Sequence, residues 1–226
     1  MGSIRRASKW RPPTRPPPTI DCEVHGRRRP PDLLETDYAV ALARLGSRDL
    51  LVALSGGDPR PSALLCAAAD SEYAARETFR EWADTTADDA LRDAFAAVAA
   101  QEDDHFHRVR AVMDAPDDHR PTGSGPMHAY LRGREDPIHR VAGGMVGRTL
   151  VSLRTHGRLI DFFDGRDADA ERLFRELRAE TADCLDDGLA TLDARASAED
   201  WEAALAVAGY TIRLAADDLA DALRET

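Results

Sequence analysis

The sequence predicts an all-α protein. From residue 32 onward, Ala, Leu, Arg and Glu dominate the chain and favour helices, whereas Gly and Pro collect between the segments. Several segments repeat apolar residues at alternating spacings of three and four, which is the pattern of helices packed nearly antiparallel in a bundle. No alternation of apolar and polar residues is long enough to predict a strand.

Short elements are expected at the beginning of the chain. Residues 1–31 contain seven of the 13 prolines, interleaved with arginine, and show almost no apolar periodicity. We expect this basic tail to be disordered and residues 32–226 to form one domain. Within that domain, a short helix is expected at about 33–45, ended by Gly46, and a second one before the turn sequence SGGDPRP.

Five longer helices follow, of which the first four are expected to form the bundle and the fifth to add a C-terminal helix. They cover about 62–84, 87–113, 137–164, 168–194 and 199–224. The third begins with Asp136 as its N-cap and Pro137 at its first position, and Ser197 caps the fifth. A connection at about 115–136 contains one short helical turn, MHAYLRG.

Two of these helices carry ionisable side chains on their apolar faces. Glu72 occupies an apolar position of the first long helix, and Glu102 and His105 occupy two successive apolar positions of the second. A buried carboxylate is costly unless it is paired or binds a metal. Glu-x-x-His places a carboxylate and an imidazole one turn apart, and a Glu from a neighbouring helix can complete half of a dinuclear site. Such ligands suit iron or manganese, and zinc is also compatible.

An internal polar network is the alternative explanation for these three residues. Glu72, Glu102 and His105 could hydrogen-bond to one another or to an arginine, and a Glu-x-x-His pair arises easily by chance in an acidic helical protein. However, Glu102 and His105 lie at apolar positions of their helix, and Glu72 lies 30 residues upstream of Glu102 in a predicted helical hairpin. Together these positions favour a cluster that faces the interior. Whether this cluster holds a metal stays open at this point.

The segment AAADSEYAARETFREWA followed by LRDAFAAVAAQEDDHFHRV resembles the first helical hairpin of the rubrerythrin-like members of the ferritin-like superfamily. The resemblance covers residues 62–113 and implies a ferritin-like antiparallel four-helix bundle. It also implies Glu72 and Glu102 as carboxylate ligands and His105 as the imidazole ligand of iron. Residues 137–194 would be the second hairpin, in which GMVGRTLVSLRT is similar to haloarchaeal chains of this family.

The third long helix departs from the pattern of that family. A complete di-iron site needs an inward Glu on this helix, but no carboxylate lies between Pro137 and Ile160. Arg148 lies instead near the level expected for the metal. A guanidinium beside Glu102 could replace the charge of a metal ion with a buried ion pair.

The fourth long helix lacks the second Glu-x-x-His. Its nearest acidic candidate is Glu180, but the apolar phase of the helix points Thr181 and Cys184 inward at the positions that correspond to Glu and His. The second half of the site is therefore eroded, and a mononuclear site with Glu180 as a candidate ligand remains open.

Charge is distributed unevenly along the chain. Residues 1–31 hold eight basic and two acidic residues and so have a net charge of +6. Since the whole chain has a net charge of −11, residues 32–226 have a net charge of −17. Lys9 is the only lysine, and pairs of aspartates recur. This composition is typical of a halophilic proteome, although a GC-rich genome would also favour it. An acidic body repels phosphate backbones and is a poor candidate for binding nucleic acid.

The composition also limits location and chemistry. No apolar run approaches the ~20 residues of a spanning helix, and no apolar signal region follows the first charges, so we expect a cytoplasmic protein. The cysteines are far apart, without a C-x-x-C pair, at Cys22, Cys66 and Cys184. A disulfide framework, a zinc knuckle and the rubredoxin-like iron site of many rubrerythrins are therefore not expected.

Two functional hypotheses follow. In the first, a rubrerythrin-family protein with an eroded di-iron site holds one iron or manganese through Glu72, Glu102 and His105, with Glu180 as a candidate fourth ligand, and handles metal or oxidants, as in oxidative stress. In the second, the bundle is metal-free, Arg148 neutralises the carboxylates, and the protein is a structural or regulatory interaction protein. Self-association is plausible in either case, and the sequence leaves open whether the protein is an enzyme.

Overall fold

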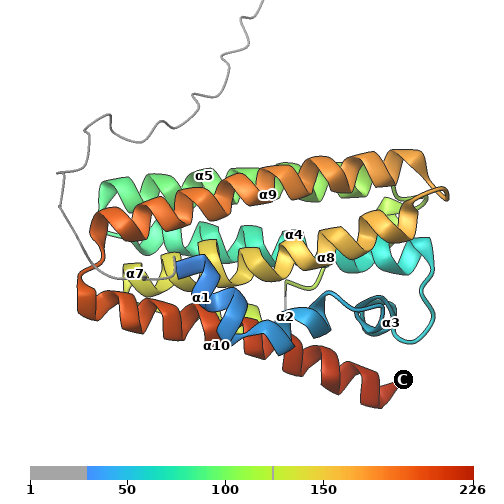
Figure 1. The fold of residues 1–226 in the computed structure, drawn as a ribbon. Coiled ribbons are helices and arrows are strands. Elements are labelled where there is room, and N and C mark those ends of the chain that lie inside the picture. The colour runs from blue at the N-terminus through green and yellow to red at the C-terminus, as the bar shows by residue number, and fades with distance from the viewer. Residues whose placement is uncertain (1–29, 124) are drawn as a thin grey trace, which may run out of the picture.

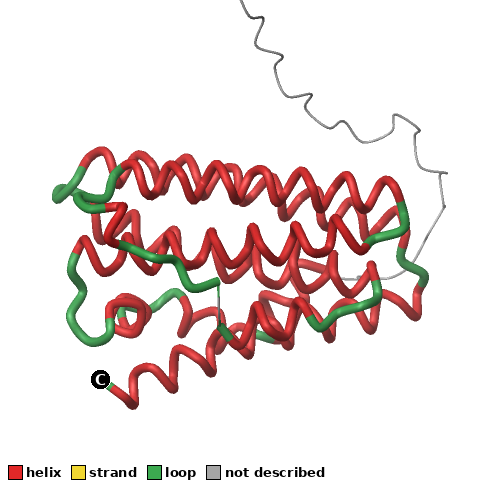
Figure 2. Tube along the Cα trace, turned by 180° about the vertical axis from the view of Figure 1, so that it is seen from behind, coloured by secondary structure: helices red, strands yellow, loops and turns green. Residues whose placement is uncertain are grey.

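The structure is a computed structural model that describes residues 30–226 except residue 124. Helices and loops make up this part of the chain, which contains no strand (Figure 2). The prediction of an all-α protein is therefore confirmed. The disorder predicted for the basic tail lies almost entirely outside the described residues, and the first helix already begins at Pro30.

The helices follow one another closely along the chain. In order they are α1 (Pro30–Asp37), α2 (Ala39–Leu45), α3 (Asp49–Ser55), α4 (Pro61–Thr85), α5 (Asp89–Ala111), a 3-10 turn η1 (Pro116–Asp118), α6 (Pro126–Arg132), α7 (Pro137–Arg140), a π-helical segment η2 (Val141–Arg148), α8 (Thr149–Phe163), α9 (Ala168–Arg195) and α10 (Ala198–Glu225). The helix expected at 33–45 is two helices, because the backbone leaves helical geometry at Tyr38. The helix expected at 137–164 is continuous through α7, η2 and α8.

Side-chain caps lie at the beginnings of several helices. The Asp88 side chain accepts a hydrogen bond from the Leu91 amide at the start of α5, and Asp136 does the same for His139 at the start of α7. Ser197 forms a capping box at the start of α10. Each cap satisfies an amide that the first helical turn leaves without a partner, which typically stabilises a helix by ~1 kcal/mol. The caps predicted at Asp136 and Ser197 are confirmed.

The long helices lie side by side in layers (Figure 1). Helix α4 packs along α5, and α8 packs along α9, since only short turns connect the members of each pair. Helices α5 and α9 form the upper layer of Figure 1, α4 and the α7–η2–α8 rod form the middle one, and α10 covers the rod from below. None of the helices in the described part of the chain is long and apolar enough to cross a membrane.

Glycines let the π-helical segment approach its neighbours. A Cβ atom on Gly144 would lie 2.5 Å from the Trp82 ring of α4, and one on Gly147 would lie 2.6 Å from the backbone oxygen of Ala208 in α10. Any larger residue would push these helices apart. The wide turn ends at Arg148, and such π-helical insertions are frequent at functional sites.

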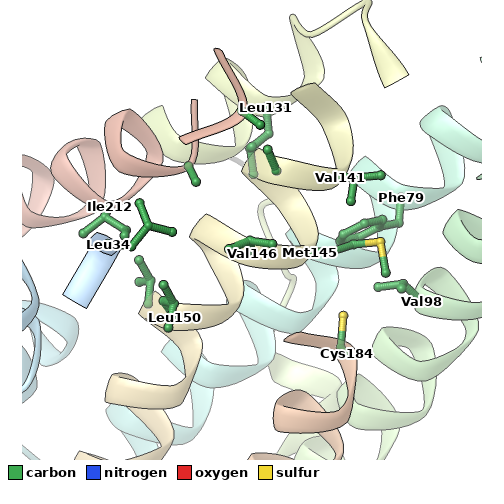
Figure 3. Close-up of a cluster of buried hydrophobic side chains, with 14 of the residues drawn as sticks. Leu34, Phe79, Val98, Leu131, Val141, Met145, Val146, Leu150, Cys184 and Ile212 are labelled. Atoms are coloured by element: carbon green, nitrogen blue, oxygen red, sulfur yellow. The ribbon is translucent and has the colours of Figure 1, made fainter. Parts of the chain in front are cut away.

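Two apolar clusters fill the interior, one toward each end of the long helices. In the first, Met145 lies among Phe79, Val98 and Cys184, which come from three different helices (Figure 3). The second gathers apolar residues of α4, α5, α8 and α9, among them Leu64, Phe106, Phe163, Phe174 and Leu177. On each of these helices, buried polar residues lie between the two clusters.

Candidate metal site

Three ionisable side chains meet in the polar layer between the two apolar clusters. Glu72 comes from α4, and Glu102 and His105 come from α5; their exposed fractions are 4%, 2% and 0%. One ligand atom from each residue can be chosen so that all three lie within 4.8 Å of one another. The structure thus brings together the three residues that the sequence pattern places on the interior face.

Each carboxylate has one oxygen anchored and one oxygen directed at the imidazole. Arg148 Nη2 donates to Glu102 Oε1 over 2.8 Å, and His156 Nε2 lies 3.2 Å from Glu72 Oε1. The other oxygens, Glu72 Oε2 and Glu102 Oε2, lie 3.7 and 4.0 Å from His105 Nδ1. These separations exceed a hydrogen bond but match two ligands of one ion, each about 2.0–2.2 Å from it.

Two of these atoms have no hydrogen-bond partner in the described structure. Glu102 Oε2 and His105 Nδ1 are buried and find no hydrogen-bond partner among residues 30–123 and 125–226. Leaving a buried polar atom unsatisfied typically costs about 1–3 kcal/mol. Two such atoms that face each other across 4.0 Å therefore form a site whose donors fit a cation.

The second nitrogen of His105 is held from outside the cluster. His105 Nε2 lies 2.9 Å from Glu180 Oε2, and Arg108 donates to both oxygens of that carboxylate, at 2.9 and 3.1 Å. Since an ionised carboxylate only accepts, Nε2 carries a hydrogen, and Nδ1 is the nitrogen that faces the cluster and can offer its lone pair to a metal once it has lost its own proton. Histidines that bind metals usually have this arrangement.

This geometry corrects the expected role of Glu180. As a candidate fourth ligand it should point into the cluster, but it contacts the imidazole from the opposite side, with 41% of its side chain exposed. Glu180 therefore orients His105 and contributes no atom to the cluster. The neighbouring Thr181 and Cys184 are buried, as the apolar phase of the helix predicts.

Arg148 places a fixed positive charge beside the cluster. Its side chain is 3% exposed and pairs with Glu102, as the sequence suggests. Its Nε also donates to the Gly144 carbonyl oxygen, and its guanidinium lies 5.3 Å from the centre of the Phe79 ring. A fixed cation so close to Glu102 repels a second metal ion.

The electrostatics of the cluster distribute its protons. Burial alone would raise the pKa of Glu72, but His105 and His156 outweigh it and hold that pKa well below 4.5. Burial raises the pKa of Glu102 to about 8, although the charge of Arg148 opposes this. Burial lowers the pKa of His105, but the adjacent Glu72 outweighs it and raises that pKa to about 9. Glu102 and His105 are therefore the groups of the cluster that take up protons, and a cation that binds there would displace such protons.

Two histidines have roles that the sequence did not predict. His156 joins the cluster through Glu72; a signal for it was its position two helical turns after Arg148, on the same face of the rod. His128 is 5% exposed, and its Nδ1 lies 3.1 Å from Thr78 Oγ1. His107 is exposed.

Comparison of the chain with protein-family models, with curated proteins and with solved structures finds no match.

Proposed function

We propose that this protein is a ferritin-like helical bundle that binds one divalent transition metal ion, iron or manganese, through Glu72, Glu102 and His105. The observation that carries the proposal is the convergence of three buried ligand atoms within 4.8 Å, two of them without a hydrogen-bond partner in the described chain. Two carboxylates and one imidazole form a donor set that suits these ions.

The surroundings support one metal ion rather than two. Arg148 donates to Glu102 Oε1, and Thr181 and Cys184 occupy the buried positions of α9 that, by the resemblance to rubrerythrins, correspond to the Glu and His of a second half-site. Burial raises the pKa of the Cys184 thiol to about 11, so this residue is a poor ligand at neutral pH. Arg148 thus supplies the positive charge that a second metal would bring.

The chain's own residues would hold and orient the metal ligands. His156 and Arg148 each fix one oxygen of a carboxylate, and Glu180 fixes the ring of His105. A bound iron would supply one-electron redox chemistry. Together with the resemblance of α4 and α5 to a rubrerythrin hairpin, this favours a role in handling metal or oxidants. Since the chain has no C-x-x-C pair, electrons would come from an external donor.

A metal-free bundle with a structural or regulatory role is the second candidate. The observation in its favour is the 2.8 Å contact between Arg148 Nη2 and Glu102 Oε1, because it already compensates one carboxylate without a metal. In that case the two buried atoms without a hydrogen-bond partner would reduce the stability of the protein, because the site that once used them has lost its ion.

Elemental analysis of the purified chain distinguishes the two candidates. The protein would be prepared in high salt without a metal-affinity column and loaded anaerobically with ferrous iron or Mn²⁺. We expect about one ion per chain, lost in His105→Gln and Glu72→Gln. The matched control is His107→Gln, the same substitution at an exposed position two residues further on. Wild-type protein without metal after loading, or equal metal in His105→Gln and His107→Gln, would contradict the proposal.

A further inference from the structure

A cavity of about 360 Å³ lies next to the candidate metal site. Residues of α3, α4, α6, α8 and α10 surround it, and Glu72 and His156 are part of its wall. Small-molecule sites in proteins typically have about 300–1,000 Å³. The cavity is therefore large enough for a small ligand that would lie against the polar layer.

The wall of the cavity is mostly aliphatic, and its charged groups are acidic. Leu50, Leu54, Val151, Leu159 and Leu219 contribute to the apolar part. Among the described residues, no arginine or lysine lines it, whereas Glu72, Asp70 and Asp218 do. Glu72 is buried at the inner end, and Asp218 is exposed at the mouth. This distribution favours an uncharged or cationic ligand over an anion.

His156 gives the inner end of the cavity a specific polar group. Its Nε2 lies 3.2 Å from Glu72 Oε1, which accepts, so that Nε2 carries the hydrogen. The other ring nitrogen, Nδ1, then presents a lone pair. It is buried and has no partner in the part of the chain that the structure describes, although the side chain is only 4% exposed. A ligand that donates a hydrogen bond would satisfy it.

We propose that this cavity binds a small molecule with an aliphatic body and a hydrogen-bond donor head group, an alcohol or a primary amine, whose head group lies against His156 in the cavity wall. The aliphatic wall takes the body of the ligand, and the acidic side chains disfavour a carboxylate head group. This site goes beyond the proposed metal site and does not require it: Glu72 belongs to both, but its Oε1 faces His156 and its Oε2 faces His105.

Binding of matched six-carbon probes tests this proposal. Hexan-1-ol, hexylamine and hexanoate would be titrated into the full chain by calorimetry and by saturation-transfer NMR, once with chelator and once after metal loading. We expect the alcohol and the amine to bind at least about tenfold more tightly than hexanoate, with or without metal. Failure of metal loading therefore leaves this test intact.

Variants locate the binding site. Ala67→Leu fills the cavity from α4 and should abolish binding, whereas Ala63→Leu makes the same change at a half-buried position of α4 outside the cavity wall and should preserve it. His156→Phe keeps the ring but removes the acceptor, and should weaken binding of the alcohol about tenfold. Thermal melts would verify that each variant is folded. No binding of the alcohol or amine, equal binding of hexanoate, or equal binding by the two leucine variants would overturn the proposal.

Discussion

Replacing Glu102 should destabilise the protein more than replacing Arg148, its partner in a buried pair. Arg148 stays charged in any environment, whereas Glu102, whose pKa burial raises, can become neutral by taking up a proton once the guanidinium is removed. Glu102→Leu leaves a guanidinium, 3% exposed, without its partner, and breaking a buried pair in this way costs about 3–5 kcal/mol. In a chain of this length, that corresponds to a fall of roughly 6–20 °C in melting temperature.

The converse variant, Arg148→Met, should cost less. It removes the hydrogen bond to Glu102 but leaves a carboxyl group that is neutral at pH 7, so we expect a loss of about 1–3 kcal/mol. The double variant Glu102→Leu/Arg148→Met should recover most of the stability, because neither charge remains in the interior.

Urea denaturation of the metal-free protein at pH 7, analysed as a double-mutant cycle, measures all three free energies. Equal losses of stability in Arg148→Met and Glu102→Leu would contradict the predicted inequality. A double variant whose loss equals the sum of the two single losses would show that the two side chains are not coupled.

Three further predictions follow from the structure. Burial, with Arg148 and Arg132 nearby, lowers the pKa of His128 to about 3. Below pH 6.5 the unfolded chain therefore binds a proton at this histidine that the folded chain does not bind. The free energy of unfolding should fall by roughly 3 kcal/mol between pH 6.5 and pH 4. His128→Phe should remove this part of the slope in denaturation experiments, and an unchanged slope would speak against it. Glu180→Gln should weaken metal binding about 10–100-fold in a competition assay, whereas Glu176→Gln, which contacts Arg108 but not His105, should not; equal losses would contradict the orienting role of Glu180. Gly147→Ala should destabilise the protein by about 1–3 kcal/mol, because the new Cβ atom would meet the α10 backbone at 2.6 Å. The control Gly157→Ala lies in open space within α8 and should be neutral or stabilising by about 0.5–1 kcal/mol, so a similar loss in both variants would show that close packing is not the cause.

Local patterns were sufficient for the helices and for the residues on their interior faces. The bounds of α4, α5, α9 and α10 agree with the expected ones within two residues, because apolar periodicity and side-chain caps are local properties of the sequence. The same periodicity placed Glu72, Glu102 and His105 inside, since each occupies a position of its helix that apolar neighbours identify as buried.

Other features depend on how one helix lies against another, which no local pattern specifies. The axial offset between α8 and α4 brings His156 next to Glu72. The axial offset between α9 and α5 brings Glu180 next to His105 Nε2. The close approach of the π-helical segment to α10 at Gly147 likewise depends on how these two helices pack.

The sequence by itself thus determined a helical protein with charged groups in its interior, because helix periodicity shows which side chains face inward. How those groups pair follows from the packing of the helices. Arg148 donates to one oxygen of Glu102, the other oxygen faces His105, and Glu180 lies outside the cluster. The physical reason is that the rotation and axial offset between helices follow from packing over their whole length, whereas hydrogen bonds and metal sites require distances of a few ångströms.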